Sequence, residues 1–149
     1  MIFISHRGNI SGRYIERENE PNYILEAKNM GYQVEIDVWN LSGKWYLGHD
    51  EPQYSVEESF FSHEGMWCHA KNLEALDALL SLKTNCFWHQ EDDYTLTSKG
   101  IIWAYPGKKL NKNSICVMPE WNKKTLDFSL CMGICSDLIK NYKEMLNGS

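Results

Sequence analysis

The expected fold follows from the stretch Gln33-Val34-Glu35-Ile36-Asp37-Val38-Trp39. Its aliphatic residues occupy alternate positions, so they fall on one face of a β-strand while the two acids fall on the other. The aliphatic face is typical of a strand that packs against helices. The two carboxylates repel each other, and a divalent cation neutralises such a pair because hard cations prefer carboxylate oxygens. The stretch predicts a strand that carries either a cation site or a solvated acidic face.

The composition is that of an ordinary globular protein. The 149 residues fit a single domain, residues 1–149, and 6 tryptophans help a short chain fill a core. The net charge of -5 argues against a general nucleic-acid binder, which carries a basic face. The 5 cysteines form no Cys-x-x-Cys pair, which indicates buried free thiols in a reducing compartment. With no signal peptide and no apolar run of membrane-spanning length, we expect a cytoplasmic protein.

Short strands separated by helical segments dominate the chain. Eight segments have strand character: Ile2–His6, Gln33–Val38, Lys44–His49, Met66–Lys71, Asn85–His89, Ile101–Tyr105, Ser114–Met118 and Met132–Ser136. Helical spacing follows Pro21, Asn72 and Asp137, and Ser55–Glu58 matches a capping box. This alternation predicts a compact α/β barrel, a (β/α)8 barrel of the TIM type with several helices shortened or missing. Because such barrels usually take about 250 residues, an open α/β sheet is the structural alternative.

Histidines gather at the predicted strand ends. Four of them lie at or near a carboxyl end: His6, His49, His69 and His89. In parallel α/β folds these ends face the ligand crevice. Each histidine shares a strand face with an apolar residue two positions earlier, so the apolar residues would fill the interior and the histidines would lie above them. A single core histidine is usually structural, but four beside Glu35 and Asp37 predict a functional cluster.

Four short motifs follow one another in the first third of the chain: His6-Arg7-Gly8, Glu18-Asn19, Glu35-Ile36-Asp37-Val38 and Gly48-His49-Asp50. In this order and spacing they resemble the glycerophosphodiester phosphodiesterases and, more broadly, the phosphatidylinositol-phospholipase-C-like phosphodiesterases. The later strands resemble that family only loosely. The resemblance implies a (β/α)8 barrel and a metal-dependent hydrolase that acts on glycerophosphodiester-like or lipid-derived phosphodiesters.

The resemblance also implies roles for individual residues. His6 and His49 would be the general acid/base pair, and Glu35 and Asp37 would hold a divalent cation. The family usually places a third carboxylate two residues before the lysine of the fourth strand, and this chain has His69 there. The predicted ligands therefore suit Mg²⁺ or Ca²⁺, while the imidazole also favours Mn²⁺ or Zn²⁺.

The same resemblance assigns the phosphate to basic residues. Arg7 and Lys71 would face it, although Arg7 alternatively pairs with Glu18 and Lys71 with Asp37. We also place Glu18 among the substrate-binding residues, together with His89, which would hydrogen-bond at the rim. Two acids that also end strands, Glu120 and Asp137, are interpreted either as supporting the site residues from behind or as structural.

The residue types suit phosphodiester cleavage independently of any family. An attacking hydroxyl must lose a proton and the leaving oxygen must gain one, and histidine titrates near neutral pH. Two alternatives stay open: a reduced barrel that binds phosphate esters without turning them over, and another metallohydrolase barrel in which histidines hold the metal. The oligomeric state is not specified by the sequence.

Overall fold

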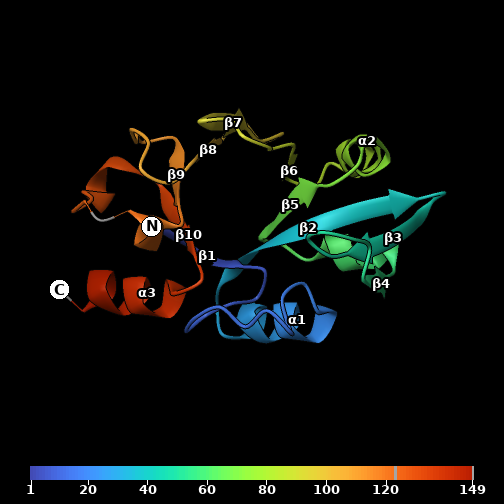
Figure 1. Ribbon diagram of the computed structural model, residues 1–149, viewed down its shortest axis with the longest axis horizontal. Helices are drawn as coiled ribbons and strands as arrows, with labels where there is room; N and C mark the ends of the chain where they lie inside the picture. Colours follow the sequence, from blue (N-terminus) through green and yellow to red (C-terminus); the bar gives the residue numbers. More distant parts are fainter. Residues whose placement is uncertain (123, 149) are drawn as a thin grey trace.

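Strand β2 (Gln33–Leu41) lies inside the sheet with a parallel neighbour on each side (Figure 1). On one side β5 (Met66–Ala70) places His69 opposite Asp37. On the other side β1 (Ile2–His6) places its last residue opposite Glu35. The computed structural model describes residues 1–122 and 124–148. The pairing of three neighbouring strands brings the residues of the predicted cluster to one level of the sheet.

The other parallel strands extend the sheet in both directions. Strand β6 (Cys86–Phe87) pairs with β5, and beside β1 follow in turn β10 (Gly133–Ser136), β9 (Ser114–Val117) and β8 (Ile102–Ala104). The sheet curls around an interior, which Figure 1 shows between β5 and β9. In the described residues no ladder joins β6 to β8, so the curl is open.

The predicted (β/α)8 barrel is wrong, because the sheet is mixed and open. Antiparallel strands β3 (Lys44–Leu47) and β4 (Tyr54–Val56) extend it beyond β2, and β7 (Tyr94–Leu96) pairs with β8. Ser42 and Gly43 have φ of 51° and 82°, which is the left-handed backbone of a two-residue hairpin turn. The third predicted strand therefore folds back on β2 and does not cross over through a helix.

Helices are fewer than a TIM barrel needs. The described residues form three α-helices, α1 (Pro21–Asn29), α2 (Leu73–Ser81) and α3 (Ile139–Asn147), and three short 3-10 helices, η1 (Glu58–Ser62), η2 (Pro119–Trp121) and η3 (Phe128–Leu130). Asn72 caps α2 as predicted, since its side chain accepts a hydrogen bond from the Ala75 amide at 3.1 Å. The predicted capping box at Ser55–Glu58 is wrong, because Ser55 belongs to β4 and no side chain caps η1.

Two apolar layers cover the two faces of the sheet. The aliphatic face of β2 packs against α1 and α2, in a cluster that includes Val34, Ile36, Val38, Ile24, Ala27, Ala75 and Leu79. The interior of the curl holds another cluster, which includes Ile4, Trp67, Phe87, Trp103 and Ile115. Three of these interior residues precede a histidine by two positions, so the predicted strand parity is confirmed for β1, β5 and β6.

Gly48 connects β3 to the loop that carries His49, and its geometry yields a prediction. Its φ is 154°, and a Cβ there would lie 2.0 Å from the Glu51 carbonyl oxygen. We expect Gly48→Ala to lower the free energy of unfolding by about 1–3 kcal/mol more than a substitution at an equally unusual but uncrowded φ, because overpacking costs about that much. The matched control is Gly12→Ala, where φ is 135° but a Cβ meets nothing within 4 Å. Equal urea midpoints for the two variants would contradict the crowding at Gly48.

Candidate functional site

Seven of the predicted site residues line a single cavity of about 350 Å³ inside the curl: His6, Arg7, Glu35, His49, His69, Lys71 and His89. Asp37 lies directly behind this cavity with none of its surface exposed. Glu18 lies elsewhere, in a second pocket that also includes His49, and its carboxylate contacts Arg7. The structure therefore brings the predicted acids, bases and cations together, with Glu18 holding Arg7 from outside the cavity.

Asp37 is the most densely contacted acid of the site. Its Oδ2 atom lies 2.8 Å from Arg7 Nε and accepts a hydrogen bond of 2.9 Å from the Asn19 amide. The Asp37 backbone N–H donates to the Asn19 side-chain oxygen at 2.9 Å. Burial raises the pKa of Asp37, but Arg7, His69 and Lys71 outweigh it and hold this pKa well below its usual range. Asp37 is therefore an anion, and Arg7 is already engaged with it.

Glu35 has a different electrostatic environment. Only 3% of it is exposed, and its Oε2 atom has no hydrogen-bond partner in the described part of the chain. Burial and then the charge of Asp37 raise the pKa of Glu35, and the nearby His6, Arg7 and His69 offset part of this. An unsatisfied buried carboxylate beside a second carboxylate is costly unless a cation or a proton joins it.

His69 places a ring nitrogen beside these two carboxylates. Its Nε2–H donates to the His89 carbonyl oxygen at 2.9 Å, so a neutral ring carries its lone pair on Nδ1. Nδ1 lies 3.2 Å from Asp37 Oδ1 and 3.9 Å from Glu35 Oε1. A lone pair facing two carboxylates is repulsive, so this geometry requires either an imidazolium or a bound cation.

The three residues fit a divalent cation. One ligand atom each from Glu35, Asp37 and His69 lies within 4.8 Å of the others. Asp37 Oδ1 and Glu35 Oε2 are both buried without a hydrogen-bond partner among the described residues, and a bound cation would satisfy both oxygens. A backbone carbonyl that orients a ligating histidine, as that of His89 does here, is a common feature of metal sites.

His6 is oriented by Asp137, which the sequence interpretation held as a supporting or structural acid, and by Asn9, to which it assigned no role. Its Nδ1–H donates to Asp137 Oδ1 at 2.8 Å, and the Asn9 amide donates to the same oxygen at 2.8 Å. The His6 Nε2 atom then faces the cavity, 3.8 Å from Glu35 Oε2. Burial lowers the pKa of His6, but Asp137 and Glu35 raise it by more, so the net shift is upward. The position of Asp137 directly after β10 was the available sequence signal for this role.

His49 reaches the cavity from the loop after β3. Because β3 runs back along β2, the Gly48 amide donates to the Asp37 carbonyl at 3.1 Å and places His49 at the level of the acids. Its Nδ1 lies 2.7 Å from Asp50 Oδ1 at the surface. Burial and the charge of Arg7 lower the pKa of His49. The two predicted catalytic histidines thus differ in the direction of their pKa shifts.

The basic residues of the cavity are held by acids. Arg7 has a left-handed φ of 55°, and besides Asp37 it contacts Glu18 at 3.3 Å. Lys71 lies farther from its partner, with Nζ 3.9 Å from Asp37 Oδ1. Both predicted alternatives, Arg7 with Glu18 and Lys71 with Asp37, are thus present as ion pairs, while both cations still line the cavity.

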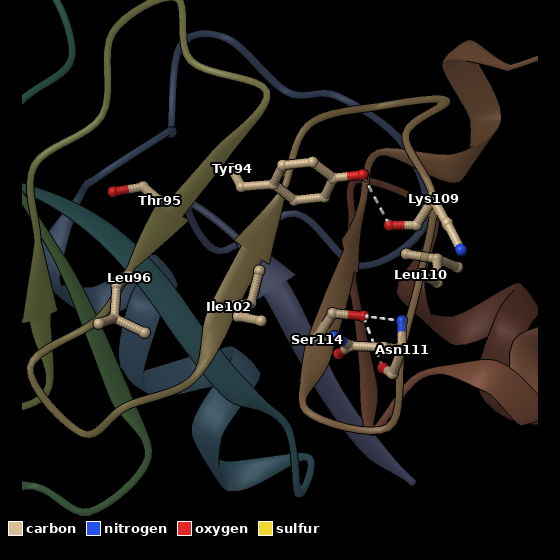
Figure 2. Close-up of a pocket in the computed structure, with 8 residues that line it drawn as sticks. All are labelled: Tyr94, Thr95, Leu96, Ile102, Lys109, Leu110, Asn111 and Ser114. Atoms are coloured by element: carbon tan, nitrogen blue, oxygen red, sulfur yellow. Dashed lines mark hydrogen bonds between the residues drawn. The ribbon is translucent and has the colours of Figure 1, made fainter.

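A second hollow in the structure differs from this cavity in the residues that line it. It has a volume of about 560 Å³ and lies between the β7–β8 hairpin and the loop before β9 (Figure 2). In Figure 2 the Tyr94 hydroxyl donates to the Lys109 carbonyl at 3.0 Å, and Ser114 is hydrogen-bonded to Asn111. Its lining contains no histidine or acid, so the acid–base groups named here belong to the cavity inside the curl.

Comparison of the chain with protein-family models, with curated proteins and with solved structures found no match. The resemblance of its four motifs is therefore carried by the residues alone. Within residues 1–122 and 124–148, no helix combines the length and apolar character needed to cross a bilayer.

The pairing of His6 with Asp137 predicts a measurable titration. We expect Asp137→Asn to lower the pKa of His6, because the anionic acceptor on Nδ1 is lost, in an NMR titration of the histidine ring signals. Since the folded-state pKa of His6 is raised, this interaction stabilises the native protein below the unfolded-state pKa, and the stabilisation is lost as pH rises through the folded value. His63, outside the cavity, provides the internal control. An unchanged His6 titration would contradict the pairing.

Proposed function

We propose that the chain is a metal-dependent phosphodiester hydrolase acting on glycerophosphodiester-like or lipid-derived substrates. The observation that carries the proposal is the single cavity that combines two histidines with opposite pKa shifts, two cations and a three-residue cation site. The order of the four motifs in the first third of the chain supports the same chemistry.

The two histidines suit different halves of the reaction. His49, whose pKa is lowered, is neutral near pH 7 and would take the proton from an attacking hydroxyl of the substrate. His6, whose pKa is raised by Asp137, would be the imidazolium that protonates the leaving oxygen through Nε2. A new bond from the attacking oxygen to phosphorus forms as the bond to the leaving oxygen breaks.

The phosphoryl charge needs stabilisation by cations. Lys71 and Arg7 line the cavity and would contact the non-bridging oxygens, with Glu18 and Asp37 fixing the guanidinium. Glu35, Asp37 and His69 would hold the divalent cation, which when bound supplies Lewis-acid stabilisation of that charge. Mg²⁺ or Ca²⁺ suit the two carboxylates, and Mn²⁺ or Zn²⁺ suit a site with one imidazole.

A second candidate function is a phosphate-ester binding module without turnover. The contact of 2.8 Å between Arg7 and Asp37 favours it, because the guanidinium already neutralises one acid without a metal. In that case the cavity would retain an ester through Lys71 and Arg7 while the histidines perform no proton transfer.

Hydrolysis of a chromogenic phosphodiester and of a glycerophosphodiester, assayed across several divalent metals, tests the proposal. We expect His6→Ala and His49→Ala each to reduce kcat/KM by about 100-fold or more, since general acid–base groups contribute 10²–10⁴-fold. EDTA should abolish turnover, and His63→Ala, outside the cavity, should match the parent. Parent-like turnover by either site variant would refute the acid–base assignment, and phosphate-ester binding without turnover under any metal would establish the binding module.

A further inference from the structure

The cavity has two chemically different walls. The charged wall carries the histidines, acids and cations described above. The other wall comes from β8, β9 and the segments that directly follow them, and it consists mainly of aromatic and apolar side chains: Trp103, Tyr105, Pro106, Val117, Met118 and Trp121. The proposed chemistry uses the charged wall, which leaves the aromatic wall without an assigned role.

Two large aromatic side chains of this wall are exposed to solvent. Trp121 is 63% exposed and Tyr105 is 42% exposed, although both line the cavity. Trp121 reaches this place because Met118 adopts a left-handed backbone, with φ of 45°, which turns the chain into η2 directly after β9. Covering exposed rings of this size with another apolar surface is favourable, because it removes apolar area from water. The mouth of the cavity is thus suited to an apolar part of a ligand.

The residues of the aromatic wall restrict which kind of ligand group can bind at the cavity mouth. The hydrogen-bonding atoms of the aromatic wall lie at the edges of its rings, on Trp103, Tyr105 and Trp121, so a polyhydroxyl group covering the ring faces would lose hydrogen bonds with water. A cationic group would feel the charges of Arg7 and Lys71 in the same cavity, while the Glu35 carboxylate already faces His6 and His69. A neutral planar ring avoids both costs and can stack on the exposed faces.

We propose that Tyr105 and Trp121 form the subsite for the leaving alcohol, and that this alcohol carries a neutral planar ring. This inference rests on the proposed function. The ring would lie against Tyr105 and Trp121 while the phosphate faces Arg7 and Lys71. When the attacking hydroxyl forms its bond to phosphorus and gives its proton to His49, the bond to the ring-bearing alcohol breaks and its oxygen takes the proton of His6.

Three glycerophosphodiesters test the subsite, with 2-phenylethanol, 2-cyclohexylethanol or choline as leaving alcohol. The first two carry a six-membered carbon ring on the same two-carbon tether, and the ring is planar and aromatic in one and puckered and saturated in the other. We expect kcat/KM for the phenylethyl ester to exceed the other two by about tenfold, as expected for one stacking contact. Trp121→Ala should remove this preference, while Trp121→Phe should retain most of it. The matched control is Trp88→Ala, since Trp88 is 38% exposed but does not line the cavity.

Equal kcat/KM for the three esters, or a preference for the choline ester, would overturn the ring subsite. Loss of the preference in Trp88→Ala but not in Trp121→Ala would overturn it as well. If the parent hydrolyses none of the esters with any metal, the proposed function fails, and calorimetric binding of 2-phenylethyl phosphate and 2-cyclohexylethyl phosphate decides the subsite separately. Tighter binding of the phenylethyl compound that depends on Trp121 would support the subsite, and equal binding would overturn it.

Discussion

Two buried carboxylates, separated by one residue on the inner face of β2, impose the main constraint on this molecule. Glu35 and Asp37 are almost completely removed from water, and like charges in such a setting are strongly unfavourable without compensation. The surrounding groups supply it: a guanidinium and an amide bind Asp37, and two histidines face Glu35. These groups come from three separate parts of the chain, His6-Arg7, Asn19 and His69, so the charge pair also selects how the strands and loops assemble.

The site is built from strand ends and backed by hydrogen bonds from the loops. The pairing of β1, β2 and β5 places His6 opposite Glu35 and His69 opposite Asp37, because parallel neighbours in register bring their carboxyl ends together. His49 arrives differently, on the returning arm of the β2–β3 hairpin. The aromatic wall then completes the cavity from the other half of the sheet. Charge on one wall and rings on the other make the cavity complementary to a molecule with both kinds of group.

Local patterns in the sequence predicted the strands and the orientation of their side chains. Alternation of Ile4 with His6 and of Trp67 with His69 was sufficient to predict an apolar interior below polar strand ends, and the structure confirms it. Barrel closure was mispredicted, because the turn at Ser42-Gly43 and the short connections decide topology through geometry that hydrophobic spacing does not report. The partners of Asn9, Asn19 and Asp137 depend on contacts between distant segments, such as the 2.8 Å bond from His6 to Asp137, so local patterns could mark Asn19 and Asp137 as candidates but could not predict these contacts.

The central claim is that Glu35, Asp37 and His69 together form one cation site, and anomalous diffraction from crystals soaked in MnCl₂ tests it most directly. The account predicts a manganese peak at coordination distance from a carboxylate oxygen of each acid and from His69 Nδ1. A manganese peak elsewhere, or none while the three side chains keep the positions described here, would contradict it.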